Sequence, residues 1–293
     1  MTYARLPSAD AIATIPHLPD WITLGCAETP EDVAFLSGAS LAHLHLVVGQ
    51  AEVPHALLRE RLALRAAEAC VGFSGRPERA ADLRDELHLL RPGDQLGPAG
   101  AIYGQWRRAV IRPISVPALK RAMPEALKDH VAVWLDAGQG GPVAQAAAVL
   151  EAVQADHPAE EVAALILGDA ALARALGWSH VWPLLSALKR RELRLTGDEL
   201  TRACHRAVRR AVVGAVREAA DLTRRAARLQ AVAPKLRAKG AGEAVQMFLT
   251  QDAVAPAALP LPDRAARRLC DRLVELGVVR ELTGRATFRL YGV

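Results

Sequence analysis

Residues 262–293 read PDRAARRLCDRLVELGVVRELTGRATFRLYGV, and this stretch decides the fold expected for the C-terminal end of the chain. Its first residues, proline and aspartate, are typical of a helix start. From Arg264 to Leu276, apolar residues fall on one helical face and arginines on the other. Gly277 predicts the helix end. Segments 278–282 and 287–291, on either side of the Thr-Gly-Arg-Ala turn at 283–286, then predict a β-hairpin.

The segments before this stretch complete a small fold. We expect a short helix over 241–249, a turn over 250–256 and a helical stub over 257–259. A lone hairpin is only marginally stable in water, so this one must pack on the preceding helix, through Val279, Phe288 and Leu290. The order of helix, turn, helix, basic helix and hairpin predicts a winged-helix-like module.

The rest of the chain is expected to be mainly α-helical. Half of the residues are apolar and only 4% are aromatic, and alanine, leucine, arginine and valine dominate, which favours helices over sheets. The predicted domains are an irregular lead-in at 1–30, a multi-helix domain at 31–197, a long connecting helix at 198–233 and the winged-helix-like domain at 234–293. Within the lead-in, Trp21, Ile22 and Leu24 are expected to lie over the core. The helices expected in the multi-helix domain are 33–48 (nearly all buried), 55–71, 78–90, 97–110, 143–154, 158–176 and 181–189.

The connecting helix has the longest periodic pattern in the sequence. Its apolar positions step by three or four from Leu200 to Leu229 and are mostly alanine. A coiled-coil dimer would suit this spacing, but the stripe has few leucines and no β-branched side chains. The central helix of a bundle is therefore the better interpretation, and it should close before Pro234.

Charge is distributed unevenly along the chain, whose overall formal charge is +5. Residues 1–200 hold 19 basic and 24 acidic side chains (net −5), and residues 201–293 hold 18 and 8 (net +10). Such asymmetry indicates a nucleic-acid or other polyanionic partner. The plainer alternative is a soluble protein with an arginine-rich helical end.

The four cysteines are scattered, without a Cys-x-x-Cys pair. Cys70, Cys204 and Cys270 sit inside apolar helical patterns, so neither a disulfide framework nor a zinc site is expected. No signal peptide or membrane-spanning run is apparent. We therefore expect a soluble, cytoplasmic protein without a membrane partner.

The basic end suggests a set of contacts to double-stranded DNA. In a winged helix used on DNA, the basic helix enters the major groove and the hairpin tip reaches phosphates or the minor groove. We expect base or phosphate contacts from Arg264, Arg267 and Arg268, phosphate contacts from Arg272, Arg285, Lys235 and Lys239, and tip contacts from Arg285 and Thr287. The alternative is an ordinary salt-bridged surface, because Asp271 lies four residues from Arg267 and Glu275 three from Arg272.

Three C-terminal stretches carry a resemblance to a known family. They are APKLRAKGAG (233–242), DRAARRL (263–269), and VRELTGR (279–285) with FRLYG (288–292). The chain resembles the bacterial domain-of-unknown-function family 1403, closely over these C-terminal residues and more loosely upstream. The resemblance implies no activity, substrate or catalytic residue.

Candidates for chemistry are weak elsewhere. His43 and His45 are two residues apart on a helix and point to different faces, so we expect them to pack rather than to bind a metal. The run 131–135, followed by the glycines at 138–141, imitates a phosphate-binding loop but lacks the lysine and hydroxyl residue of a P-loop; it and the run 162–167 are predicted to be helices. A group of acids and one histidine could also converge: Glu60, Glu68, Asp82, Asp85, Glu86 and His88. Each of these also suits a solvated helical face, so we predict no catalytic, metal or cofactor site.

Three functions follow from this pattern. The first is a non-enzymatic DNA-binding protein with a regulatory or replicon-maintenance role, whose helical body dimerises or senses a signal. The second is an adaptor whose hairpin binds a protein partner. The third is an enzyme with its site among the N-terminal helices. They predict, respectively, a positive surface at the C-terminal end, an exposed apolar patch beside the hairpin, and a deep polar pocket.

Overall fold

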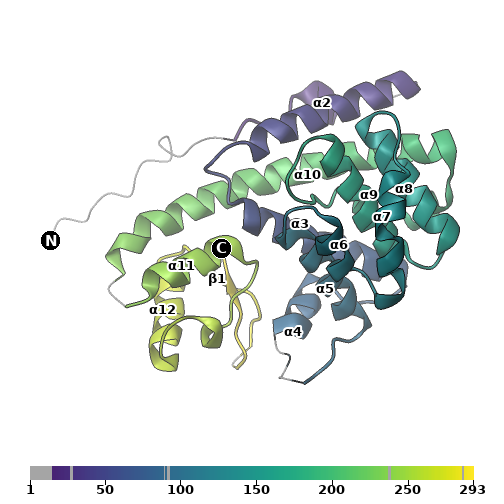
Figure 1. Cartoon of the computed structure of the whole chain (residues 1–293). Coiled ribbons are helices and arrows are strands. Elements are labelled where there is room, and N and C mark those ends of the chain that lie inside the picture. Colours follow the sequence, from purple (N-terminus) through teal and green to yellow (C-terminus); the bar gives the residue numbers. More distant parts are fainter. Residues whose placement is uncertain (1–14, 27–28, 89, 91–92, 237–238, 286) are drawn as a thin grey trace. The chain divides into compact units, whose positions relative to one another are not determined.

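The structure is a computed structural model that describes residues 15–293 except 27–28, 89, 91–92, 237–238 and 286 (Figure 1). Over these residues the chain is mainly α-helical, with twelve α-helices, 69% helical content and one small two-stranded antiparallel sheet near the C-terminus. This confirms the prediction that the protein is mainly α-helical. The described residues form two compact units: one contains 15–17, 46–58 and 216–293, and the other contains 18–45 and 59–215.

Over its described residues, the larger unit contains helices and connecting loops but no strand. Its α-helices are α1 (Asp20–Thr23), α2 (Pro30–Val48), α3 (His55–Phe73), α4 (Ala80–His88), α5 (Pro98–Ile111), α6 (Val116–Ala122), α7 (Val131–Asp136), α8 (Pro142–Asp156) and α9 (Glu161–Ala175). Three 3-10 helices, η2 (Glu125–His130), η3 (Leu185–Ala187) and η4 (Arg190–Arg194), connect them, and the first half of α10 (Gly197–Val232) completes the unit. The last residues of α2 (46–48) and the first residues of α3 (55–58) belong to the other unit.

The core of the larger unit is built around α9. Every residue of α9 from Ala163 to Ala173 is buried, as expected for a helix that is apolar on all sides. Gly168 allows neighbouring segments to approach closely, because a Cβ atom there would lie 2.8 Å from Leu185 Cδ1 and 3.2 Å from the Ala146 carbonyl oxygen on α8. The pair α8 and α9 is therefore packed backbone to backbone.

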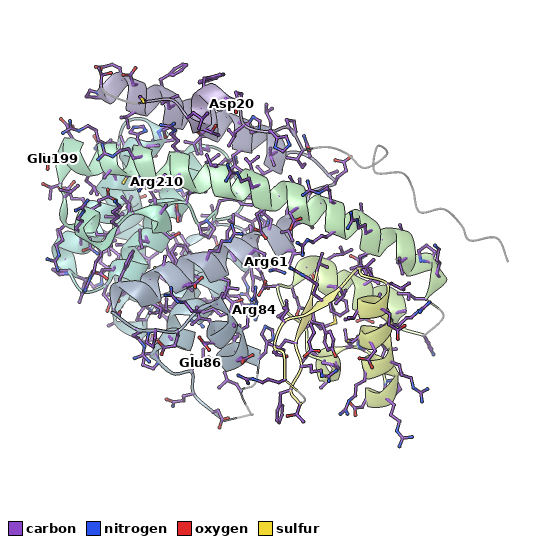
Figure 2. The ribbon with its side chains drawn as sticks, turned by 180° about the vertical axis from the view of Figure 1, so that it is seen from behind. Asp20, Arg61, Arg84, Glu86, Glu199 and Arg210 are labelled. Atoms are coloured by element: carbon purple, nitrogen blue, oxygen red, sulfur yellow. The ribbon has the colours of Figure 1, made fainter. Side chains whose placement is uncertain are left out.

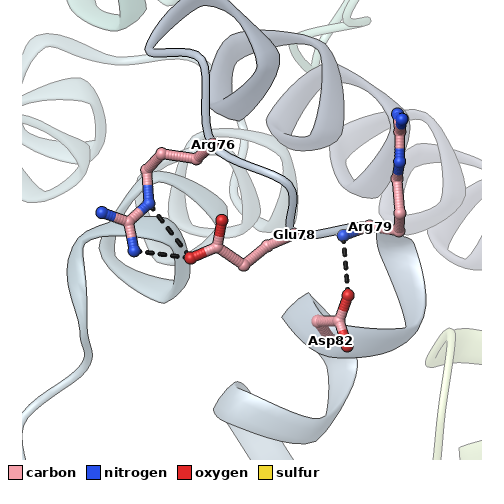
Figure 3. Close-up of polar contacts among 4 residues, drawn as sticks. All are labelled: Arg76, Glu78, Arg79 and Asp82. Atoms are coloured by element: carbon pink, nitrogen blue, oxygen red, sulfur yellow. Dashed lines mark hydrogen bonds and ion pairs between the residues drawn. The ribbon is translucent and has the colours of Figure 1, made fainter.

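Local polar contacts explain where several helices begin. At α2, the Thr29 hydroxyl accepts the Asp32 N–H (3.2 Å), and the Asp32 carboxylate accepts the Thr29 N–H (3.1 Å), which is a reciprocal capping box. At α4, the Asp82 carboxylate accepts the N–H of Arg79 (2.9 Å), immediately after an Arg76–Glu78 ion pair (Figure 3). Acids in the first turn also favour helix formation electrostatically.

Helix α10 confirms the longest sequence pattern. The pattern predicts a helix over about 198–230, and the helix spans Gly197–Val232. Along the predicted stripe, Leu200, Ala207, Ala219 and Leu229 are all buried. Within the larger unit, the Arg209 guanidinium on α10 donates to the carbonyl oxygens of Ile22 and Gly25, both at 2.7 Å.

The smaller unit holds the second half of α10 and the C-terminal elements. These are η5 (Ala233–Lys235), α11 (Ala241–Thr250), η6 (Pro256–Ala258), α12 (Asp263–Glu275), β1 (Arg280–Glu281) and β2 (Tyr291–Gly292). In the sheet, Arg280 pairs with Gly292 and Glu281 with Tyr291. Val254 extends it through an antiparallel bridge to Tyr291, with N–H···O distances of 2.8 and 2.9 Å. Val245, Phe248, Leu269, Leu273 and Leu290 are buried in this unit.

Several predictions about the helical body are wrong. The segment 181–189 holds only the 3-10 turn η3 rather than a helix, and Pro183 interrupts it. The lead-in contains the short helix α1, whose Ile22 is buried while Trp21 and Leu24 are exposed. Helix α2 is not nearly all buried, because Phe35 and Leu46 lie on an exposed face.

The hairpin is shorter than predicted. The left-handed backbone at Phe288 (φ 57°) interrupts the strand expected over 287–291. The predicted packing of Val279 and Leu290 is confirmed, whereas Phe288 is exposed. The turn predicted over 250–256 contains the Val254 bridge, which a single residue cannot signal in sequence.

Candidate nucleic-acid interface

Helix α12 presents one apolar and one basic face. Ala266, Leu269, Cys270 and Leu273 are buried, and the arginines on the other side of the helix are exposed; they are Arg264, Arg267, Arg268 and Arg272. The helix ends at Gly277, whose left-handed φ of 67° is favourable for glycine, and the Val278 N–H returns to the Leu273 carbonyl oxygen (3.1 Å). The buried face anchors α12 and the same geometry turns its arginines outward.

Two of these arginines form ion pairs along the helix. Arg267 pairs with Asp263 (Nη2–Oδ2 3.0 Å), and Arg272 pairs with Glu275 (Nη1–Oε2 3.0 Å). The sequence had suggested Asp271 as the partner of Arg267, and Asp263 takes that place. All four side chains are well exposed, and such surface pairs typically contribute only about 0.2–1 kcal/mol. Either arginine can therefore exchange its carboxylate for another anion at small cost.

The other two arginines of α12 are free cations. Within the part of the chain that the structure describes, neither Arg264 nor Arg268 forms an ion pair or a side-chain hydrogen bond. They are four residues apart on one helix and so share a face. Among the described residues, their positive charge has no ion-pair partner.

The loop between β1 and β2 adds further exposed positive charge. Arg285, Thr287 and Arg289 are exposed, and residues 282–293 contain no acid. Arg289 donates from Nε to the Arg285 carbonyl oxygen (3.1 Å) and lies 3.7 Å from a Glu281 carboxylate oxygen. A hydrogen bond with Tyr291 and the nearby Glu281 raise the pKa of Arg289. The sequence reasoning missed Arg289 and the exposure of Phe288, because both were placed in a regular strand.

The remaining nominated residues lie on the segment before α11. Lys235 is in η5, Lys239 follows shortly before Gly240, and both side chains are exposed. All eight nominated residues thus lie in the smaller unit. Four of them share the outer face of α12, and Arg285 and Thr287 share the β1–β2 loop.

His45 and the three buried cysteines have packing roles. The His45 ring accepts a hydrogen bond at Nδ1 from Trp178 Nε1 (2.8 Å), which agrees with a packing role. Among the described residues, no group of three His, Cys, Asp or Glu side chains is placed to hold a metal ion. The four cysteines are free thiols, and burial raises the pKa of Cys70, Cys204 and Cys270 to about 12.

Three of the acidic candidates make separate contacts in the larger unit. Glu60 is buried and accepts from Arg107 Nε (2.9 Å), and Glu68 lies 3.9 Å from Arg79. The Glu86 carboxylate lies against α5, where a Cβ at Gly100 would come within 2.5 Å of it; Figure 2 labels Glu86. The two segments that imitate a nucleotide site, 131–135 and 162–167, are helical as predicted, in α7 and α9.

One buried carboxylate was not anticipated. Asp169 on α9 accepts both the Leu184 N–H (3.1 Å to each oxygen) and the Leu185 N–H (3.0 Å). Burial raises its pKa well above the ordinary value, and the two backbone hydrogen bonds oppose that shift. Asp169 therefore fixes the start of η3 on α9. Its position within the apolar run Leu165–Leu172 gave no sign of these partners.

The structure defines a mainly helical protein with a small, basic C-terminal unit. Over the described residues, no helix combines the length and apolar character needed to cross a membrane. A family model described as "Protein of unknown function (DUF1403)" matches residues 7–293, so the chain belongs to this family. This confirms the resemblance and extends it over nearly the whole chain. Comparison with curated proteins gives no match.

Proposed function

We propose that the C-terminal unit is a winged-helix-like module that binds double-stranded DNA. The observation that carries the proposal is the pair of exposed arginines, Arg264 and Arg268, on the outer face of an amphipathic helix; neither has an ion-pair partner among the described residues. Phosphate contacts from Lys and Arg supply most non-specific affinity for DNA, and unpaired cations make them without first breaking an ion pair.

The order of elements supports this interpretation. Helix α11, the single-residue bridge at Val254, the short 3-10 helix η6, helix α12 and the strands β1 and β2 follow one another in this order. In this arrangement α12 is the recognition helix and the β1–β2 loop is the wing. Arg264, Arg267 and Arg268 then lie at the front of the recognition helix, where base edges and phosphates are reached. Arg272, Arg285, Lys235, Lys239 and Thr287 supply the surrounding backbone contacts.

The larger unit has a non-enzymatic role in this proposal. It dimerises or senses a signal, while the smaller unit holds DNA, as in a regulatory or replicon-maintenance protein of the bacterial cytoplasm. A two-fold dimer would present two recognition helices to half-sites about one helical turn of DNA apart. The oligomeric state in solution, measured by light scattering with and without duplex, tests this part.

The direct test is fluorescence anisotropy of the full chain with a labelled random duplex at several salt concentrations. We expect micromolar or tighter binding that weakens steeply with salt. The R264A/R268A variant should bind at least tenfold more weakly and show a shallower salt dependence. R191A/R194A removes the same charge from exposed residues of η4 in the larger unit and should bind as the native protein does. Equal binding by both variants would place the contact elsewhere, and no binding at low salt would exclude the proposal.

A protein-binding role is the second candidate. Val274 and Leu276, at the end of α12, and Phe288, in the β1–β2 loop, are exposed apolar side chains. An adaptor predicts such side chains beside its wing. If a V274S/L276S variant loses a protein partner that the native chain retains in a pull-down, yet binds DNA normally, the protein-binding role exists in addition to DNA binding.

A further inference from the structure

Phe288 combines two properties that protein folding disfavours. Its side chain is 69% exposed, and its backbone has φ 57°, in the left-handed region. Among the described residues it is the one non-glycine position with positive φ. Bulky L-residues are rare outliers in this region, and such outliers concentrate at functional sites.

The surrounding loop imposes this conformation. The Leu290 N–H donates to the Thr283 hydroxyl (3.4 Å), and the Leu282 N–H donates to the Leu290 carbonyl oxygen (2.8 Å). Arg289 is tied to the Arg285 carbonyl oxygen across the loop. Glycine adopts positive φ without strain, so the fold alone gives no reason for phenylalanine at this position.

The chemistry around the ring indicates what it contacts. Arg285 and Arg289 stand on either side of it in sequence, and Thr287 precedes it, all of them exposed. Phe35 on α2 provides a contrast. It is similarly exposed (65%), but it stacks on Trp21 with ring centroids 5.6 Å apart, and residues 33–48 contain no lysine or arginine. Phe288 is therefore an exposed aromatic residue whose neighbours in the sequence include two exposed arginines.

We infer that Phe288 is a wedge that enters the DNA minor groove and inserts between adjacent base pairs. The inference rests on the proposed DNA-binding function and adds the mode of contact. Apolar side chains used in this way unstack a base step and bend the duplex, while flanking arginines hold the phosphates. Pyrimidine–purine steps such as TA are the most easily unstacked, so the preferred ligand is a duplex with such a step.

The test compares F288G with native protein and with F35A as the matched control. The probe is a duplex with a central TA step, 2-aminopurine in place of the adenine, and a dye at each end. Native protein should raise 2-aminopurine fluorescence and bring the two ends closer together. F288G should bind at least tenfold more weakly and cause neither change, while its melting temperature stays at or above that of the native protein. F35A should behave as the native protein in all DNA measurements.

The other outcomes separate the wedge from DNA binding itself. If F288G binds and bends the duplex as native protein does, the wedge is excluded and the DNA-binding proposal stands. If native protein binds no duplex at low salt, both proposals fail together. Binding to the same oligonucleotide without its complementary strand is measured as well. Tighter, Phe288-dependent binding to this single strand would overturn the wedge in favour of stacking on unpaired bases.

Discussion

Charged side chains at the described sites of the two units serve different purposes. In the larger unit, several charged groups are turned inward: Asp169 accepts two backbone N–H groups, Glu60 pairs with Arg107, and Arg209 donates to two carbonyl oxygens. In the smaller unit, Arg264 and Arg268 face solvent. Net charge therefore says less about a partner than the placement of each charge does. Inward charges determine stability, whereas outward charges are available for binding.

The largest expected effect comes from Asp169. D169A leaves the buried N–H groups of Leu184 and Leu185 without an acceptor, which should lower the free energy of unfolding by about 3 kcal/mol. D169N keeps one acceptor oxygen and should cost less than half as much. Urea unfolding followed by circular dichroism measures both. If D169A lowers the free energy of unfolding by less than about 1 kcal/mol, Asp169 is not one of the inward charges that determine stability.

The same carboxyl group predicts a pH dependence. Because burial raises its pKa in the folded state, the folded protein binds more protons than the unfolded chain between the ordinary carboxyl pKa of about 4 and the raised value. The free energy of unfolding contributed by Asp169 therefore falls as pH rises through that window. The stability difference between native protein and D169N should shrink with increasing pH. A difference that grows instead would show that the backbone hydrogen bonds outweigh burial.

Neighbouring arginines on α10 give a sharper test of inward against outward charge. Arg209 donates to two carbonyl oxygens at 2.7 Å, whereas Arg210 is more exposed and donates to the Ala187 carbonyl oxygen (2.9 Å); Figure 2 labels Arg210. R209A should lower the free energy of unfolding by about 2 kcal/mol. R210A should lower it by about 0.5 kcal/mol. Equal values in urea titrations would contradict the distinction.

The smallest effect is expected in the smaller unit. R264A/R268A should change the free energy of unfolding by less than about 0.5 kcal/mol, because neither side chain has a partner among the described residues. Thermal and urea unfolding of this variant should overlay those of the native protein. A clear destabilisation would mean that these arginines support the fold and would weaken their assignment to a ligand.

Regular elements were the most predictable part of the molecule. The alanine stripe of α10 and the apolar run of α9 follow the helical period, so their sequence patterns locate them to within a few residues. The segment 181–189 also looked apolar and helical, but Pro183 and the hydrogen bonds from Leu184 and Leu185 to Asp169 hold it in another conformation. A tertiary contact to a distant carboxylate has no local sequence signal.

The candidate site likewise has a part that the sequence predicts and a part that it does not. The outward face of α12 could be predicted because the apolar spacing fixes which residues are buried. The loop could not, because alternation over 287–291 suggests a strand that buries Phe288, while the structure gives that residue positive φ and exposes it. The predicted domain boundaries and DNA contacts stay predictions.

The burial of three thiols gives the protein a chemical selectivity. Burial raises the pKa of Cys70, Cys204 and Cys270 to about 12, so these thiols stay protonated at neutral pH. Cys26 is exposed after α1 and is the remaining cysteine of the chain. A maleimide dye should therefore attach at Cys26 alone in the native protein. Cys70, Cys204 and Cys270 lie on α3, α10 and α12, so each further dye that attaches during heating would report the opening of one of these helices.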